Sequence, residues 1–436
     1  MIFSISLLSI LLTTTHPLLS SAVQDVQVNL DRTHLFRHMM DIGGHRNLPE
    51  IVQTEDCPGT PFLWKIIDDK SGNHVGFGLG TLHLPVDLVL TDHAYASIIH
   101  AVEDSCAVYG EIDMADMAVA AQIAECVGDL DSGAARISDI QDEDLRLKYE
   151  SITREIATVV AAGAGADAAV VDSIHQNLLN VSLYNLLLFI SYYNTPEYEQ
   201  YFVPTLLGMP PALLDETILS IGRPNGGVEM VSTQCDILEE LFVTLEELDE
   251  ENLRLGLNQT LSGQINLYMC GDIDSFANAQ VLAFEQSAMD SEFKSALLDE
   301  RNEQMAAEIH NILKASDDRV LFAFGASHWM VGEKKLGNLL KGYGYSLEYV
   351  PNYAKDDAED MSNEECRVVF NSISGEFDLI ETSNSTGSTP TINESPSASP
   401  VSSPSEGTAS PVSGATIKAK ASIFCVMCAF GSLYLY

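Results

Sequence analysis

The sequence predicts an α/β fold in which a central mixed sheet is flanked by helices. Two observations lead to this class. Strand-like and helix-like patterns alternate through the body of the chain, and two strings of the form Gly-x-x-His each close an apolar run. These strings are Gly80-Thr81-Leu82-His83 and Gly325-Ala326-Ser327-His328. Both histidines are therefore expected at the carboxyl ends of strands, where open α/β sheets bind their ligands.

The first string ends a predicted hairpin. The apolar run 62–67, the turn-rich residues 68–73 and the run 75–82 indicate two antiparallel strands, the second ending at His83. A helical pattern over 93–104 follows. The second strand of the hairpin and this helix are expected to be followed by another strand, which makes a strand–helix–strand unit.

That further strand is predicted at 107–110, directly before Glu111 and Asp113. Because crossover connections are right-handed, we expect this strand to place Glu111 beside the strand of His83.

The later elements lead toward the second histidine. A helix is expected over 212–221, and the turn 223–228 then releases a short strand before Glu229, which also fits an ordinary acid on an edge strand. A long amphipathic helix over 291–313 carries Arg301 and Asn302, where charges on a solvated face are the alternative. The strand 320–324 and a helix over 331–340 complete the series.

The residue types at these positions suit a divalent metal. Two neutral imidazoles, His83 and His328, need carboxylates beside them to offset the charge of the metal, and Glu111 and Glu229 are the candidates. Arg301 could steady a carboxylate or polarise a substrate carbonyl. A single Gly-x-x-His string is usually a structural loop, but two copies favour a site. The motifs HExxH, GxSxG and GxxxxGK[ST] are absent, which removes the standard zincin, α/β-hydrolase and P-loop assignments.

The composition divides the chain into a globular body and distinct ends. The expected segments are a signal peptide at 1–22, an N-terminal segment at 23–60, the enzyme-like domain at 61–355, an acidic extension at 356–381, a Ser/Thr/Pro-rich stalk at 382–415 and a hydrophobic membrane anchor or glycolipid-anchor signal at 416–436. The chain is thus expected at the cell surface, attached either by a single span or by a glycolipid.

The charge and the cysteines support the same setting. A formal net charge of −41 argues against a nucleic-acid partner, because phosphates would be repelled. Six of the eight cysteines lie in the body and permit up to three disulfides in an oxidising compartment, with the pairing left open. Four Asn-x-Ser/Thr strings, beginning at Asn180, Asn258, Asn384 and Asn393, are potential glycosylation acceptors.

Several short strings, in this order and spacing, resemble the TIKI metalloproteases of the wider TraB family from about residue 61 to residue 353. They are Gly80-Thr81-Leu82-His83-Leu84-Pro85, Glu111-Ile112-Asp113, Leu214-Asp215, Gly226-Gly227-Val228-Glu229, Gln234-Cys235, Asp299-Glu300-Arg301-Asn302-Glu303-Gln304-Met305, Phe322-Ala323-Phe324-Gly325-Ala326-Ser327-His328 and Gly342-Tyr343-Gly344-Tyr345.

The resemblance implies a membrane-tethered extracellular peptidase that uses a divalent metal such as Mn or Co, with Zn as a further candidate. It implies that His83, His328, Glu111 and Glu229 are metal ligands or catalytic groups, with Arg301 and Asn302 as supporting or substrate-binding groups. TIKI proteins inhibit Wnt signalling by clipping the amino-terminal end of Wnt ligands, so the implied partner is a secreted protein. A noncatalytic ligand-binding ectodomain and a metal-dependent esterase or small-molecule hydrolase remain the alternatives.

Overall fold

The protein contains one six-stranded sheet in the order β4-β3-β5-β2-β1-β6. The computed structural model describes residues 59–354, apart from gaps at 114–115, 117, 120, 124, 127–129, 131–133, 164–165, 167, 207–212, 220, 222–224, 247–249, 259, 287–294 and 317. The strands are β1 Leu63–Asp68, β2 His74–Thr81, β3 Ala107–Gly110, β4 Asn225–Gly227, β5 Val320–Gly325 and β6 Tyr345–Tyr349. The mixed sheet confirms the predicted fold class.

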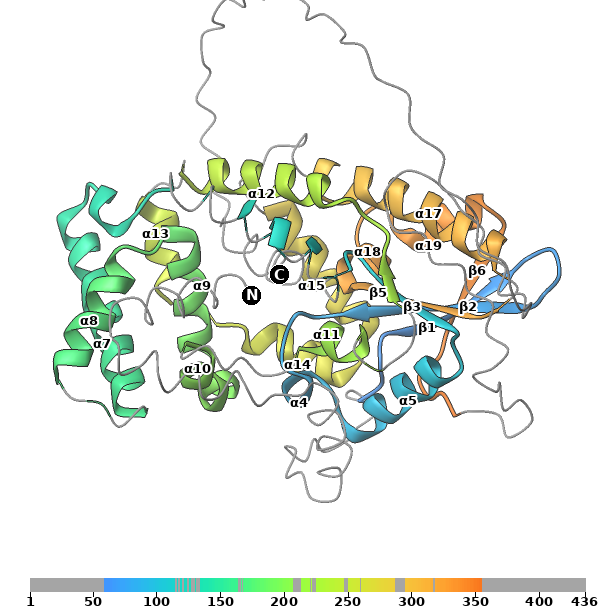
Figure 1. Ribbon diagram of the computed structural model, residues 1–436, viewed down its shortest axis with the longest axis horizontal. Coiled ribbons are helices and arrows are strands. Elements are labelled where there is room, and N and C mark those ends of the chain that lie inside the picture. Colours follow the sequence, from blue (N-terminus) through green and yellow to red (C-terminus); the bar gives the residue numbers. More distant parts are fainter. Residues whose placement is uncertain are drawn as a thin grey trace, which may run out of the picture.

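Four neighbouring strands of this sheet run parallel to one another. β3 pairs in parallel with β4 and with β5, and β5 pairs in parallel with β2. β1 is antiparallel to both β2 and β6, so the predicted hairpin is confirmed as β1 and β2. The parallel strands therefore end at one common edge, on the left of the sheet in Figure 1.

The strand order corrects one expectation. Glu111 was expected beside the strand of His83, but β5 lies between β3 and β2, and Leu321 pairs with Phe77 on one side and Val108 on the other. The physical reason is burial. All six residues of β5 are buried, and a strand without a polar face is most stable in the centre of a sheet that is covered on both faces.

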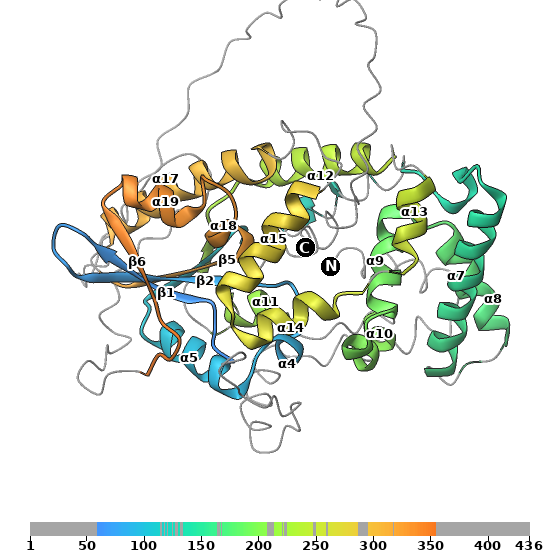
Figure 2. The ribbon, with the colours of Figure 1, turned by 180° about the vertical axis from the view of Figure 1, so that it is seen from behind.

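Helices cover both faces of the sheet. α17 Arg301–Ala315 and α19 Leu336–Gly342 lie along one face and α5 Asp92–Glu103 along the other, as both ribbon views show (Figures 1 and 2). A further group of helices lies beyond the carboxyl ends of the parallel strands in both ribbon views. The remaining described helices include α4 Val86–Val89, α7 Glu143–Gly163, α8 Ala168–Leu179, α9 Leu183–Tyr193, α10 Glu199–Leu206, α11 Leu214–Leu219, α12 Val231–Glu246, α13 Glu250–Gly256, α14 Ser262–Cys270, α15 Ile273–Gln286 and α18 Ala326–Met330.

Two predicted helices differ in detail from those observed. The helix expected over 331–340 is wrong in its first half, since α18 ends at Met330 and α19 begins only at Leu336. Gly332 has a φ of +81° between them, a backbone conformation that ends a helix. The long helix expected over 291–313 begins, within the described residues, as the π-helical turn η3 Ser295–Glu300 and continues as α17. Such wide turns frequently occur at functional sites.

The predicted signal peptide, stalk and C-terminal anchor lie outside the described residues. Within residues 59–354 and their stated gaps, none of the helices has the length and apolar character required to cross a bilayer.

Candidate active site at the carboxyl edge of the sheet

The ends of the four parallel strands bring the predicted site residues together. Glu111 follows β3 directly, and His83 and Glu229 each stand two residues beyond the end of β2 and β4. His328 lies in α18, which begins where β5 ends. All four side chains are less than 5% exposed. Ionisable groups are rarely buried to this degree unless they are paired, so their partners define the chemistry of the site.

Arg301 is the centre of a buried charge network. Its Nη2 donates to Oε2 of Glu111 at 2.8 Å and to Oε2 of Glu229 at 2.7 Å, while its Nε donates to Oε1 of Glu229 at 2.8 Å. The amide of Gln234 also donates to Oε2 of Glu229. Arg301 therefore holds two carboxylates in fixed positions, and both oxygens of Glu229 already accept hydrogen bonds.

Glu111 has a different set of partners. Its Oε1 accepts a hydrogen bond of 2.6 Å from the backbone N–H of Gly325, at the end of β5. The same oxygen lies 3.6 Å from Nε2 of His328. The carboxylate of Glu111 thus lies beside the imidazole of His328, in the helix that follows the neighbouring strand. This contact exists only because β5 lies next to β3.

Each imidazole is oriented through its Nδ1 atom. Nδ1 of His328 lies 2.6 Å from Oδ1 of Asn302, which is on the first turn of α17. Nδ1 of His83 lies 3.0 Å from Oδ2 of Asp215, which is on α11. The residue-by-residue patterns did not single out Asp215 or Gln234 as site residues. Their only signal was their presence in the strings Leu214-Asp215 and Gln234-Cys235.

The position of His328 depends on the packing of its neighbour Trp329. The Trp329 ring stacks on Phe324 at a centroid distance of 5.8 Å and on Trp64 at 5.7 Å. It lies so close to β2 that a Cβ atom at Gly78 would be 2.6 Å from Cζ3 of the ring. The absence of a side chain at Gly78 thus allows α18 to rest on the sheet and fixes where His328 points.

The surroundings separate the pKa values of the two imidazoles. Burial lowers the pKa of His328 to about 3, although Glu111 opposes this shift, so His328 is neutral near pH 7. Burial also acts to lower the pKa of His83, but the carboxylate of Asp215 outweighs it and the pKa of His83 is raised. A neutral imidazole is the form that can bind a metal or accept a proton.

The two glutamates are shifted in opposite directions. Burial acts to raise the pKa of Glu111, but His328 and Arg301 favour the carboxylate and the pKa of Glu111 is lowered. Since His328 is itself neutral, Arg301 is the cation that keeps Glu111 ionised. Burial raises the pKa of Glu229 despite its contact with Arg301, and the nearby charge of Glu111 adds to this effect.

The described side chains at the site are of types that bind divalent metals, but they do not form an assembled metal-binding cluster. Imidazole nitrogens and carboxylates suit Mn, Co and Zn, and the buried Nε2 of His328 has no hydrogen-bond partner among the described residues. Across the described ranges, however, no group of three or more His, Cys, Asp or Glu side chains already forms a metal-binding cluster. His83, His328, Glu111 and Glu229 are the residues that would hold the ion. Arg301 engages both glutamates, and Glu229 also accepts a hydrogen bond from Gln234.

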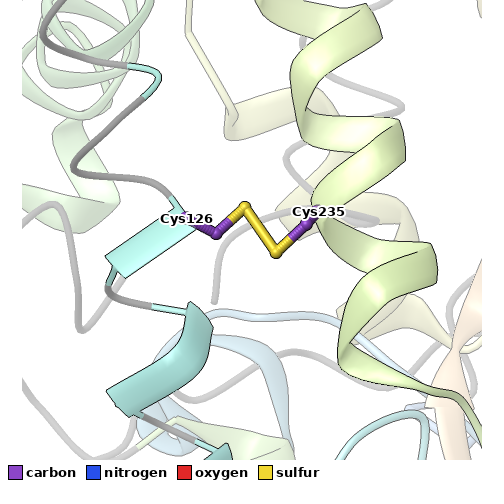
Figure 3. The surroundings of a disulfide bond; sticks show 2 residues. All are labelled: Cys126 and Cys235. Carbon is purple, nitrogen blue, oxygen red and sulfur yellow. A yellow bond between two sulfur atoms is a disulfide. The ribbon is translucent and has the colours of Figure 1, made fainter. Parts of the chain in front are cut away.

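A disulfide lies close to the site. Cys235 on α12 is bonded to Cys126, and Figure 3 shows the bond joining that helix to the segment that carries Cys126. Cys235 is the neighbour of Gln234, so the bond restrains the helix that supports Glu229. Cys106 and Cys270 are also disulfide-bonded. The expectation that cysteines of the body form disulfides is confirmed for these residues.

Sequence comparison places the chain in a known family. Residues 62–349 match the sequence model of the TraB/PrgY/gumN family, and the chain belongs to that family. Its curated relatives include metalloprotease TIKI1 of Danio rerio, with 24% identity over 66% of this chain and 63% of the relative, and metalloprotease TIKI2 of Xenopus tropicalis, with 24% identity over 66% of this chain and 60% of the relative.

A shorter match reaches the metalloprotease TIKI homolog of Nematostella vectensis, with 31% identity over 29% of this chain and 32% of the relative. The chain spans about three fifths of the length of the first two relatives. No solved structure matches. All of these relatives are named metalloproteases.

Proposed function

We propose that this protein is a metal-dependent peptidase whose active site is the cluster at the carboxyl edge of the parallel strands. The observation that carries the proposal is the convergence of two buried imidazoles and two buried carboxylates just beyond the ends of four different strands. Arg301 pairs with both carboxylates, His328 lies beside Glu111, and the charge of His83 also acts on Glu111. Burying so many ionisable groups costs stability, and such costs are typical of sites selected for chemistry. The relatives named metalloproteases support the same reaction class.

The roles of the residues follow from their contacts. A divalent metal such as Mn or Co, with Zn as a further candidate, would supply Lewis-acid polarisation of a scissile carbonyl and a lowered pKa for water, with His83, His328 and one of the two glutamates as its holders. Glu111 is ionised and stands beside His328, so it is the better placed of the two glutamates to accept a proton from the attacking water.

Arg301 has a supporting role in this scheme. It keeps Glu111 ionised and holds Glu229 through two hydrogen bonds. Glu229 would join the metal, or act as the proton acceptor in place of Glu111, after giving up one of those bonds. A guanidinium that is released in this way is then free to stabilise negative charge developing on a substrate carbonyl.

The substrate and location are part of the proposal. We take the substrate to be the amino-terminal region of a secreted protein, with Wnt ligands as the candidates that the TIKI resemblance names, so that cleavage would reduce Wnt signalling. The disulfide-bonded cysteines support an oxidising, extracellular compartment. Attachment to the plasma membrane, by a span or a glycolipid, rests on the sequence pattern of residues 416–436.

The test is cleavage of a library of amino-terminal peptides by the purified chain, with and without added Mn²⁺ or Co²⁺. We expect metal-dependent cleavage that is lost in His328→Ala and that falls by about 10²–10⁴-fold in Glu111→Gln, the usual contribution of a general base. His310→Ala is the matched control, because His310 contacts Tyr345 away from the site. Full activity in both site variants, folded as judged by thermal unfolding, would refute the assignment.

Two other outcomes would redirect the proposal. Metal binding without any turnover would support a noncatalytic ligand-binding protein of the same fold. Hydrolysis of esters without peptide cleavage would support a metal-dependent esterase, because a fold does not fix its substrate.

A further inference from the structure

We propose that Asp215 is a positioning residue that fixes the ring orientation and tautomer of His83. The inference deepens the proposed function and rests on it in so far as His83 is taken to bind the metal. It assigns a role to a residue that the strand-end pattern of the sequence did not reveal.

The contact between the two side chains is short and buried. Nδ1 of His83 lies 3.0 Å from Oδ2 of Asp215, and each side chain is only 1% exposed. A carboxylate removed from water in this way requires a polar partner, since an isolated buried charge is strongly unfavourable. His83 provides such a partner.

The backbone holds the two residues in this relation. The N–H of Leu214 donates to the carbonyl of Leu84 at 3.1 Å, and Pro85 forms an isolated β-bridge with Leu213. Leu84 and Leu214 are the immediate neighbours of His83 and Asp215. The distance between the imidazole and the carboxylate is therefore set by main-chain pairing and does not depend on a flexible loop.

The chemistry of the acceptor selects one tautomer of the ring. An ionised carboxylate accepts hydrogen bonds but cannot donate one, so a neutral His83 beside it carries its proton on Nδ1. The lone pair is then on Nε2, the nitrogen available to a metal. Asn302 makes the equivalent contact with Nδ1 of His328, but its amide can offer either an oxygen or an NH₂ group. Asp215 is thus the more selective of the two orienting groups.

The first measurement needs neither metal nor activity. In metal-free protein with ¹⁵N-labelled histidine, at a pH where the ring is neutral, the His83 signals are expected to report a proton on Nδ1, with His83→Ala identifying them. In Asp215→Ala this preference should be lost, and in Asp215→Asn, which can donate or accept, it should be weakened.

The second measurement is the affinity for Mn²⁺ by titration calorimetry. Removal of a group that orients a metal-binding imidazole typically costs 10–100-fold in affinity, and we expect a loss in that range for Asp215→Ala. Asp104→Asn is the matched control. Asp104 is a buried aspartate that pairs with Arg319 at 2.6 Å and with Tyr353, next to the start of β3 and so at the opposite end of the strands. Its variant should lose stability but keep the tautomer and the Mn²⁺ affinity.

The outcomes separate the two ideas. If Asp215→Ala is folded, as judged by thermal unfolding, and leaves both the tautomer and the Mn²⁺ affinity unchanged, the positioning role is wrong. If that variant does not fold, the same comparison is decided by Asp215→Asn. If the tautomer changes while the unaltered protein binds no Mn²⁺ and cleaves no peptide, Asp215 positions His83 but the proposed function fails.

Discussion

Replacing Arg301 with methionine is expected to destabilise the protein strongly. The variant keeps most of the side-chain volume but removes three charge-assisted hydrogen bonds and leaves Glu111 and Glu229 buried without their cation. Removing one partner from a buried ion pair typically costs about 3–5 kcal/mol. At roughly 2–4 °C per kcal/mol for domains somewhat smaller than this one, the midpoint of thermal unfolding should fall by about 6–20 °C.

The assay is thermal unfolding followed by circular dichroism, with Arg154→Met as the matched control. Arg154 pairs with Asp172 at 2.8 Å, but the two side chains are 58% and 65% exposed. An exposed pair contributes at most about 1 kcal/mol, so the control should unfold near the unaltered protein. Equal midpoints for the two variants would refute the reasoning that the Arg301 network is buried and coupled.

The pH dependence and a second substitution sharpen this prediction. Without Arg301, burial should raise the pKa of the stranded glutamates above their unfolded values, so the folded state binds protons more readily than the unfolded state. The deficit of Arg301→Met should therefore shrink as the pH falls. Adding Glu229→Gln to Arg301→Met, which removes one stranded charge, should recover part of the lost stability at pH 7. A deficit that grows in acid would contradict this account.

Two further predictions concern Trp329 and His74. Gly78→Ala should lower the free energy of unfolding by about 1–3 kcal/mol, because its Cβ would overlap the packed Trp329 ring. Gly263→Ala is the control, since Gly263 has open space around it and the substitution should be neutral or stabilising. Denaturant unfolding followed by tryptophan fluorescence compares the two variants. Burial, followed by the charge of Arg319, lowers the pKa of His74 to about 4, so the unfolded chain binds the proton more tightly. The free energy of unfolding should therefore decrease as the pH is lowered from about 6.5 to about 4. This pH dependence should be weaker in His74→Phe, and an unchanged pH dependence would count against the role of His74.

Local patterns in the sequence determined the elements that carry the site. Alternation and turn residues predicted the β1–β2 hairpin, the apolar runs predicted β3 and β5, and the strings ending in His83 and His328 predicted histidines at the carboxyl edge. These features depend on residues close together in the chain, so they can be read without knowing the fold.

The tertiary structure alone decided which groups meet at that edge. The order of the strands placed β5 beside β3 and gave Glu111 the N–H of Gly325 as its partner, across 214 positions of sequence. Packing turned Arg301 inward onto Glu229, across 72 positions, where the sequence left open a solvated helix face or a role in steadying a carboxylate. It also brought Asp215 to His83. Contacts of this kind are fixed by burial and by the pairing of distant backbone segments, which leave no periodic signal in the sequence.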